Sequence, residues 1–202
     1  MRDPEYLPVM EEFYTIQGEG HYTGTPAYFI RLGGCDVGCK WCDVKDSWDA
    51  SQYDWIDVNI LVDHARNSGA SLVVVTGGEP FMHNLSLLTE KLREANLQCN
   101  VETAGVHLPS GSWDWICFSP KKFKKPIHEY YEAAQELKIV LFHRSDFKWA
   151  ESHALQMNLE AQKYLQPEWS KAKEITPLIV DYVKRNPSWK ISLQTHKFID
   201  IP

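Results

Sequence analysis

The chain has 202 residues, of which 44% are hydrophobic, 24% charged and 12% aromatic, and these proportions exclude a disordered tail, a collagen-like fibre and a coiled coil. Lysine and arginine total 21 against 27 aspartate and glutamate residues, so the formal net charge is −6. Nucleic-acid binders usually carry the opposite sign or a long basic stripe, and neither DNA nor RNA is expected as a partner.

Short apolar runs alternate with amphipathic stretches from the first third of the chain onward. A strand is predicted at residues 27–32, and a helix follows at 58–67, where apolar side chains recur at helical spacing. The next strand is predicted at 72–76. The helix after it spans 84–96, with Asn84 as its expected N-cap.

The second half of the chain continues this pattern. Five further strands are predicted at 100–103, 115–119, 137–142, 163–166 and 190–194. A third helix is predicted at 177–185, with Pro177 in its first turn, where a missing N–H is tolerated. No repeat or linker divides the sequence, so residues 1–202 are expected to form a single domain.

Alternating strands and helices predict right-handed βαβ units on a parallel sheet. A complete eight-unit barrel needs about 250 residues. The shorter chain therefore predicts an α/β fold with an incomplete TIM-like barrel of about six parallel strands and flanking helices. Ligands bind at the loops after the strands in such folds, and polar motifs follow the predicted strands at 33–42, 76–80, 103–105, 119–121, 166–169 and 194–196.

Cys35, Cys39 and Cys42 fall within eight residues in a glycine-bearing loop after the first predicted strand. Three thiolates so close together can converge on one soft metal centre, one ligand short of the usual four. A cubane iron–sulfur cluster on three cysteines leaves one iron open to an exogenous chelate, such as the amino and carboxylate groups of an amino acid.

Two other interpretations of the triplet stay open. The first is a structural zinc site completed by Cys99, Cys117 or His21, and the second is three unconnected core cysteines. Cys99 and Cys117 alternate with apolar neighbours, so they are expected to be small core residues. The odd total of five cysteines fits poorly with a disulfide framework.

No targeting or membrane segment is predicted. Residues 1–5 lack the charged-then-apolar pattern of a secretory signal, and the longest apolar runs, 72–75 and 139–142, are too short to cross a bilayer. A cytoplasmic protein without a membrane partner is expected.

A second motif, Thr-Gly-Gly-Glu-Pro at 76–80, follows a predicted strand. Paired glycines let a ligand approach the backbone, although alone they are common in turns. Together with the Cys-x3-Cys-x2-Cys loop, this motif resembles the radical S-adenosylmethionine (SAM) superfamily. The resemblance implies that Cys35, Cys39 and Cys42 hold three irons of a 4Fe-4S cluster, with SAM on the fourth.

Further segments narrow the resemblance. Gln-Gly-Glu-Gly at 17–20, Trp-Cys-Asp at 41–43, Ser-Pro-Lys at 119–121 and Leu-Gln-Thr-His-Lys at 193–197 are similar to the 7-carboxy-7-deazaguanine synthases. The family resemblance implies a homodimer that converts 6-carboxy-5,6,7,8-tetrahydropterin into 7-carboxy-7-deazaguanine and ammonia, on the route to queuosine. It also implies a magnesium ion and an unidentified external electron donor.

The same resemblance assigns residues to ligands. It implies SAM contacts at Trp41, Cys42, Asp43, Gly78, Ser119, Pro120, Lys121, Gln166, Pro167, Glu168 and Trp169. It implies substrate contacts at Ile16, Gln17, Gly18, Arg31, Thr76 and the terminal carboxylate of Pro202. A guanidinium suits the substrate carboxylate because it binds in bidentate fashion. His196 is expected to be a structural histidine.

One position departs from the family pattern. A Thr or Ser that binds magnesium usually follows Trp-Cys-Asp, and here the residue is Val44, whose isopropyl group cannot ligate a hard cation. Either the ion is held by ligands, waters and a neighbour such as Asp43, Asp46 or Ser47, or it is weakly bound or absent. We therefore expect a weaker dependence on magnesium than the family pattern implies.

Two other functions are weighed against the synthase. One is a different radical SAM enzyme, such as a glycyl-radical activase, which shares the cysteine loop and the Gly-Gly-Glu segment but leaves the motifs at 17–20 and 193–197 unexplained. The other is a zinc-stapled binding module without catalysis.

Overall fold

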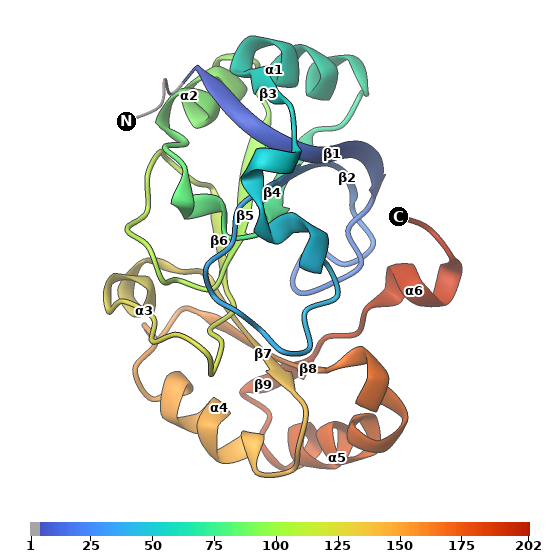
Figure 1. Ribbon diagram of the computed structural model, residues 1–202. Coiled ribbons are helices and arrows are strands. Elements are labelled where there is room, and N and C mark those ends of the chain that lie inside the picture. The colour runs from blue at the N-terminus through green and yellow to red at the C-terminus, as the bar shows by residue number, and fades with distance from the viewer. Residues whose placement is uncertain (1–4) are drawn as a thin grey trace.

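The computed structural model describes residues 5–202, and its centre is one curved sheet. Nine strands lie within the described residues in the spatial order β3-β1-β2-β4-β5-β6-β7-β8-β9. Their bounds are β1 Tyr6–Ile16, β2 Pro26–Leu32, β3 Trp55–Asp57, β4 Leu72–Gly77, β5 Gln98–Thr103, β6 Trp115–Phe118, β7 Glu136–Leu141, β8 Gln162–Pro167 and β9 Trp189–Ile191. The sheet curves around an interior without closing (Figure 1).

Strand β2 and strands β4 to β9 pair in parallel, whereas β1 runs antiparallel to both β2 and β3. The parallel part is the incomplete barrel that the sequence predicts. The antiparallel strands β1 and β3 were not predicted. The polar residues Glu11 and Glu12 interrupt β1, and its register shifts between Val9 and Glu11, so no regular alternation marks it.

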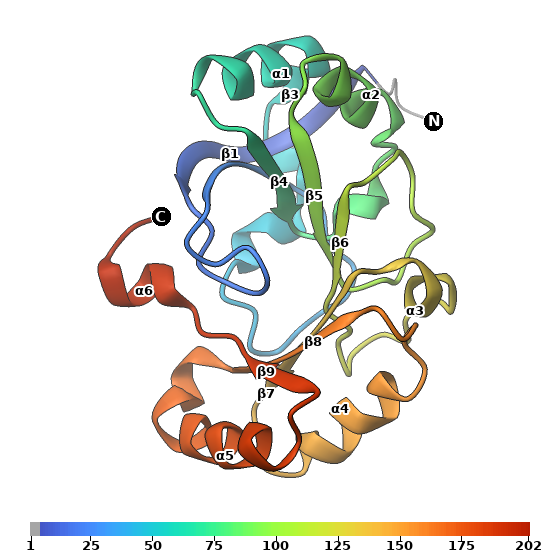
Figure 2. The same cartoon turned by 180° about the vertical axis from the view of Figure 1, so that it is seen from behind.

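Within residues 5–202, five of the six helices cover the outer side of the sheet, and the last one, α6, lies beside the open interior (Figures 1 and 2). They are α1 Val58–Asn67, α2 Ser86–Glu94, α3 Glu129–Ala133, α4 Asp146–Ala154, α5 Ala172–Arg185 and α6 Thr195–Ile199, with short 3-10 turns η1 Lys45–Trp48, η2 Ala50–Gln52, η3 Pro80–Met82 and η4 Trp169–Lys171. Helices α1 and α2 pack on each other, and α5 packs on β8 and β9. None of the helices in residues 5–202 has the length and apolar character needed to span a bilayer.

The two faces of the central strands differ in chemistry, and this difference positions the site. On β5 and β7, every second side chain is apolar and lies in the main core beneath the helices: Cys99, Val101, Leu137, Ile139 and Leu141. The side chains between them point to the opposite face of the sheet, toward the interior: Asn100, Glu102, Glu136 and Lys138. The curved sheet therefore encloses a polar interior.

Several predicted boundaries are wrong by a few residues for identifiable reasons. Helix α5 begins at Ala172, so Pro177 lies inside it rather than in its first turn. The buried residue Ile175 extends the apolar face of this helix toward its N-terminus. Helix α2 ends at Glu94 because Asn96 adopts a left-handed φ of 58°. Asn84 accepts a hydrogen bond from the Ser86 amide (3.1 Å), one residue before the assigned cap.

Strand β9 is also shorter than predicted, ending at Ile191 rather than at residue 194. The following side chains turn into the interior instead of continuing the pleat: the Ser192 hydroxyl donates to Gln166 Oε1 (2.7 Å) and the Gln194 amide to Glu19 Oε1 (2.9 Å). Helices α3, α4 and α6 were not predicted, and α3 and α6 have only five residues each.

Candidate active site

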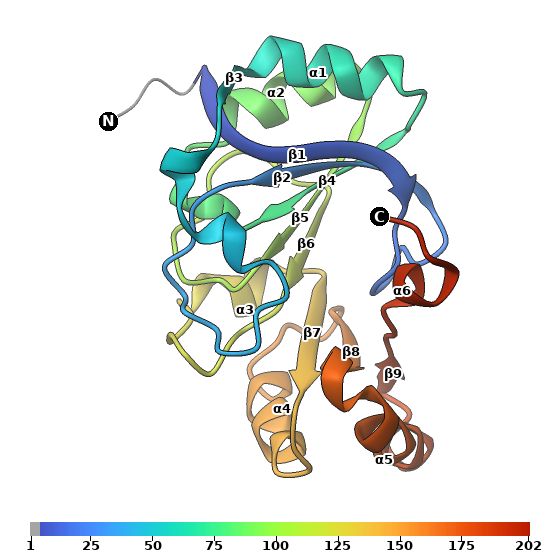
Figure 3. The ribbon, with the colours of Figure 1, turned by 45° about the vertical axis from the view of Figure 1, so that its right-hand side comes forward.

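A cavity of about 270 Å³ opens at the C-terminal ends of the parallel strands. Its walls come from the end of β1, the loop after β2, the exits of β4, β5, β6 and β8, and the chain's last segment. Figure 3 shows this arrangement, with the loop after β2 on one side of the interior and α6 on the other. The fold thus gathers the polar motifs at the edge where parallel sheets bind ligands.

The cysteine loop forms one wall of this cavity. Cys35, Cys39 and Cys42 carry free thiols, line the cavity and belong to one apolar cluster that includes Ala104 and Val106 from the exit of β5. The loop is fastened mainly through its backbone, because the Gly34 amide donates to the Ser47 carbonyl (2.6 Å) and the Cys35 amide to the Trp48 carbonyl (3.1 Å).

The chemistry of this donor set fits a cluster bound by three thiolates. Burial raises the pKa of Cys35 and raises that of Cys39 to about 11, against an opposing effect of the neighbouring Lys121 on Cys39. The thiols therefore lose their protons when metal binds. Within residues 5–202, no three Cys, His, Asp or Glu side chains are grouped tightly enough to hold a metal ion, so the sulfurs must draw together on binding.

The residues considered as a fourth zinc ligand lie elsewhere. Cys99 is fully buried in the core beneath the helices, as expected. Cys117 is buried too, but on the polar interior face of β6. His21 stacks on Trp115 with 4.4 Å between ring centroids. None of the three lines the cavity with the cysteine loop, so the geometry does not support a closed four-ligand zinc site.

The Gly-Gly-Glu segment joins the cysteine loop to the sheet. The Gly78 amide donates to the Leu32 carbonyl (2.9 Å) and the Glu79 amide to the Gly34 carbonyl (2.8 Å). A Cβ on Gly77, whose φ is 127°, would collide with the Leu32 backbone, and one on Gly78 would collide with the Gly34 carbonyl. Both positions therefore require glycine because the neighbouring backbone leaves no space for a Cβ.

The Glu79 carboxylate is structural as well. It is buried and accepts hydrogen bonds from the Thr103 hydroxyl (2.6 Å) and from the amides of Ala104 (2.8 Å) and Phe81 (3.3 Å). Burial raises its pKa, and these donors oppose the shift. Glu79 thus ties the exit of β4 to the exit of β5, which fixes the floor beneath the cysteine loop.

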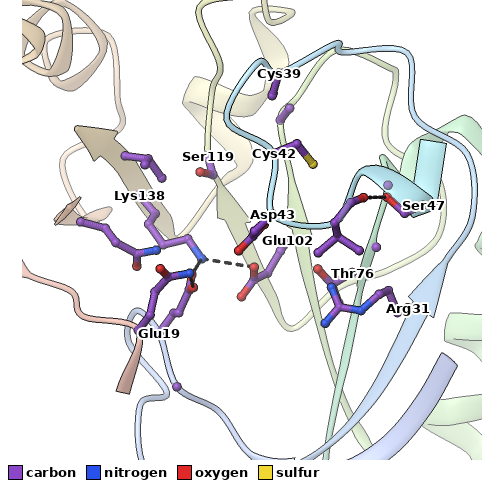
Figure 4. Close-up of a pocket in the computed structure, with 18 of the residues that line it drawn as sticks. Glu19, Arg31, Cys39, Cys42, Asp43, Ser47, Thr76, Glu102, Ser119 and Lys138 are labelled. Atoms are coloured by element: carbon purple, nitrogen blue, oxygen red, sulfur yellow. Dashed lines mark hydrogen bonds and ion pairs between the residues drawn. The ribbon is translucent and has the colours of Figure 1, made fainter. Parts of the chain in front are cut away.

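The opposite wall holds a buried ionic network. Lys138 Nζ lies 2.6 Å from Glu19 Oε2 and 3.2 Å from Glu102 Oε2, and the Lys138 side chain is only 4% exposed (Figure 4). Burial would lower the pKa of Lys138, but the surrounding carboxylates raise it well above its usual range. Burial would likewise raise the pKa of Glu19, but Lys138 and hydrogen bonds from Gln194 and Gln166 lower it to about 2. Both groups are therefore charged at neutral pH.

Comparison with known proteins identifies the fold and the family. The model of the radical SAM superfamily matches residues 29–137. A 7-carboxy-7-deazaguanine synthase from Flavobacterium psychrophilum is 54% identical over 198 residues, which cover 98% of this chain and 94% of that protein. The synthase from Escherichia coli K12 is 31% identical, covering 96% and 98%. The crystal structure of QueE from Escherichia coli matches with a TM-score of 0.85 and 29% identity over 93% of each chain.

The chain belongs to the 7-carboxy-7-deazaguanine synthase family. It is therefore a radical SAM enzyme, as the cysteine loop and the Gly-Gly-Glu segment predict. The similarity to QueE extends to the incomplete barrel, which holds the shared motifs in one cavity.

The site residues implied by the family resemblance are brought together, with one exception. Pro120 is absent from the cavity lining, whereas these residues line it: Ile16, Gln17, Gly18, Arg31, Cys35, Cys39, Trp41, Cys42, Asp43, Thr76, Gly78, Ser119, Lys121, Gln166, Pro167, Glu168, Trp169 and Pro202. Their individual contacts with SAM and substrate stay predictions.

On the wall next to the cysteines, Lys121 is held in place by Ser119. Lys121 Nζ donates to the Ser119 carbonyl (2.8 Å) and hydroxyl (2.5 Å), and burial lowers the pKa of Lys121. The same ammonium lies 5.9 Å from the ring centroid of Trp41. Trp41 also meets Phe123 edge to face, at 5.9 Å between centroids. These contacts fix the aromatic wall next to the cysteines.

Elsewhere in the cavity, Arg31 and Thr76 are paired across β2 and β4 and lie side by side (Figure 4). Arg31 Nε donates to Glu11 Oε1 (2.5 Å), so its outer nitrogens carry the remaining donors of the fork. The Thr15 hydroxyl donates to the Pro202 carbonyl oxygen (3.3 Å), which brings the last residue to the end of β1. His196 packs on Gly18, where a Cβ would collide with its ring, and lines the same cavity.

The family position for a magnesium ligand is apolar here. Val44 lines the cavity, and its carbonyl accepts the Ser47 hydroxyl (2.7 Å), so Ser47 is already engaged. Of the acidic neighbours, Asp43 lines the cavity and Asp46 does not. Asp43 Oδ2 also lies 3.1 Å from Lys197 Nζ.

No separate role was predicted from the sequence for Lys138, Glu102, Gln194 or Glu19. Glu19 and Gln194 sit inside motifs that resemble the family, but the four residues come from β7, β5, the segment after β9 and the loop after β1. Only the alternation of polar residues on otherwise apolar strands, at Glu102 and Lys138, could have indicated an inward-facing charge network.

Proposed function

We propose that this chain is a 7-carboxy-7-deazaguanine synthase, a radical SAM lyase that converts 6-carboxy-5,6,7,8-tetrahydropterin into 7-carboxy-7-deazaguanine and ammonia in the queuosine route. The observation that carries the proposal is the single cavity that has three free cysteines on one wall and an arginine with a buried ionic network on the other. This arrangement supports a cluster site next to a site for an anionic, amide-rich bicycle.

Arg31 is the residue proposed to bind the substrate carboxylate. Its Nε is occupied by Glu11, which fixes the direction of the guanidinium while leaving the terminal nitrogens for a bidentate pair. The aromatic ring of Phe13 lies 5.9 Å from the guanidinium carbon and packs against its face. Thr76 stands beside the same site and supplies a hydroxyl.

Gln17 and the network around Lys138 are proposed to orient the bicyclic ring. The Gln17 side chain is held at both ends, since its Nε2 donates to Glu102 Oε1 (3.1 Å) and its Oε1 accepts the Glu19 amide (3.1 Å). Glu102 in turn pairs with Lys138. A network fixed before the substrate binds loses little further entropy when it positions the ring.

When bound, the cluster on Cys35, Cys39 and Cys42 together with SAM supplies the radical chemistry, and the protein supplies placement and exclusion of water. Ser119, Lys121 and Trp41 form the wall next to the cysteines, and Gly78 allows close approach of the methionyl end of SAM. Gln166 and the segment to Trp169 border the same space on the β8 side.

We also propose that magnesium assists only weakly in this member of the family. Val44 offers no oxygen from its side chain, and the Ser47 hydroxyl donates within its own turn. Asp43 is the carboxylate positioned to contribute, although it shares its oxygen with Lys197.

The proposal extends to the assembly and the cellular setting. We propose a cytoplasmic homodimer that receives its electron from a separate donor protein. Exposed apolar side chains on α6 and β1, Phe198, Ile199 and Tyr14, support an interface between copies. Sedimentation velocity tests this point: a species of twice the chain mass of 23.4 kDa is expected, and a monomer at micromolar concentration contradicts it.

Turnover tests the function. Anaerobically reconstituted protein is incubated with SAM, dithionite and 6-carboxytetrahydropterin, and ammonia and 7-carboxy-7-deazaguanine are measured. Equal amounts of both products are expected. Formation of 5′-deoxyadenosine without deazaguanine indicates a different radical SAM reaction, and a colourless protein with one tightly held zinc indicates a binding module.

A further inference from the structure

A second, much smaller cavity lies at the opposite end of the barrel interior from the cysteine loop. Its volume is about 10 Å³, the size that one water molecule needs by the same measure. It is lined by both polar and apolar side chains, and three of the polar ones, Gln17, Glu19 and Glu102, also line the active-site cavity. The small cavity is therefore directly behind the proposed substrate site.

Glu136 supplies an unsatisfied acceptor at this cavity. The residue is 2% exposed, and its Oε2 accepts hydrogen bonds from the Trp115 indole (2.9 Å) and the His21 amide (3.2 Å). Its Oε1 is the sole buried side-chain nitrogen or oxygen in residues 5–202 without a hydrogen-bond partner. Leaving a buried acceptor unpaired costs about 1–3 kcal/mol, so a donor at Oε1 stabilises the fold.

The backbone leaves room at this oxygen. Gly20 has a φ of 64°, and a Cβ there would collide with Glu136 Oε1. The glycine thus lets the loop after β1 pass beside the carboxylate without covering it with a side chain.

Negative charge is in excess around the cavity. Glu19, Glu102 and Glu136 face Lys138, and the first two carboxylates already pair with that ammonium. Burial raises the pKa of Glu136, Lys138 and the Trp115 and His21 donors lower it, and Glu102 raises it further. The other titratable groups nearby are neutral: Cys117 and Tyr164, whose pKa values burial raises, and the His21 ring, whose pKa burial lowers.

We propose that this cavity is a binding site for one hydrogen-bond donor of water size, held by Glu136 Oε1 beside the aromatic residues Tyr22 and Trp115. Two molecules share this chemistry: a solvent water, and the ammonia released from the substrate, which is protonated at neutral pH. Binding of ammonia rests on the proposed function, whereas binding of water does not.

An outer cavity adjoins the small cavity on the far side. Trp115 lines both the small cavity and this outer cavity of about 350 Å³, whose other walls include His21, Gln135 and Gln162. Trp115 therefore separates the buried site from the outside, and the active-site cavity is on the other side of Glu102.

The Trp115 indole is a built-in probe, because its N–H donates to the same carboxylate. Its ¹H–¹⁵N resonance, assigned with Trp115→Phe, is followed in the full-length protein without turnover. In ammonium-free buffer, a cross-relaxation signal between a long-lived water and the indole proton is expected. Ammonium chloride, against sodium chloride at equal ionic strength, is expected to shift the resonance saturably, and methylammonium is expected to be too large.

Two matched variants decide the assignment. Glu136→Gln keeps an acceptor for Trp115 but turns an amide donor toward the cavity, so the ammonium shift is lost. Glu160→Gln removes an exposed carboxylate that lines only the outer cavity and leaves the shift unchanged. A water signal without an ammonium shift assigns the site to water. Absence of both in the wild type, or an unchanged ammonium shift in Glu136→Gln, overturns the proposal, and neither result depends on catalysis.

Discussion

The cysteine loop and the Lys138 network face each other across one cavity but are built in opposite ways. The loop takes its three sulfurs from eight consecutive residues and holds itself mainly by backbone hydrogen bonds to Ser47 and Trp48. The network takes its charged side chains from three separate segments, and each is held by another side chain. The loop is thus suited to receive a ligand, and the network to keep its geometry without one.

This contrast predicts that breaking the loop removes the cluster and leaves the fold. Cys39→Ala is expected to reduce iron from about four atoms per chain to less than one after reconstitution, while the urea midpoint of the ligand-free protein changes little. Iron analysis and circular dichroism measure the two effects. Cys99→Ala, in the core on the other side of the sheet, is the matched control and should retain iron. A Cys39 variant with full iron content would contradict the role of the loop.

The opposite outcome is expected for the network. Lys138→Met leaves Glu19 and Glu102 without their buried counter-charge, so we expect a loss of about 3 kcal/mol in the free energy of unfolding. Urea denaturation of the ligand-free protein measures it. The double variant Lys138→Met/Glu19→Gln should recover part of the loss. If the single variant is as stable as the wild type, the network has no structural role.

The stability that the Lys138 network contributes is expected to depend on pH through Glu19. The pKa of Glu19 is about 2 in the folded protein against an ordinary value of 4.5. Its stabilisation is therefore complete above the ordinary value and is lost as the pH falls towards 2. The unfolding free energy of the wild type relative to Glu19→Gln should fall by about 2 kcal/mol between pH 7 and pH 3. A difference independent of pH would mean that the fold does not lower the pKa of Glu19.

The next largest effect is expected at Arg31, the residue proposed to bind the substrate carboxylate. Arg31→Lys keeps the charge but loses bidentate geometry, so the KM for the pterin should rise about tenfold, equivalent to about 1.4 kcal/mol, with little change in kcat. Steady-state kinetics measure it. Arg66→Lys on the exposed face of α1 is the control. Equal effects of the two substitutions would remove Arg31 from the binding site.

The smallest effect concerns magnesium. Val44→Thr places a hydroxyl at the family's usual ligand position, and we expect the stimulation of turnover by magnesium to increase by a few-fold over that of the wild type. Val180→Thr on the surface of α5 is the control. A wild-type enzyme that already depends strictly on magnesium would show that another oxygen replaces the missing side chain.

The same contrast explains what the sequence could predict. The parallel strands, the helices α1 and α2 and the cysteine loop are encoded within short windows, and the family resemblance rests on those windows. Strand β1 was missed because its bulge and its glutamates hide the alternation. The side chains of Lys138, Glu19 and Gln194 are separated by up to 175 residues, and only the curvature of the sheet shows that they meet.

The Glu79 carboxylate also has a role that its sequence motif does not show. Its sequence context indicates a ligand-binding turn, yet its oxygens accept donors from Phe81, Thr103 and Ala104. A short motif identifies the family, but which of its atoms face the ligand depends on packing between neighbouring strands.

The most direct test of the account is the state of the metal on the cysteine loop. Anaerobic reconstitution should give a brown protein with about four irons and four sulfides per chain, and its reduced electron paramagnetic resonance spectrum should change when SAM is added. The account would be contradicted by a spectrum that SAM leaves unchanged or by a single zinc that resists removal. Either result would show that Cys35, Cys39 and Cys42 do not hold a cluster with a fourth iron open to SAM.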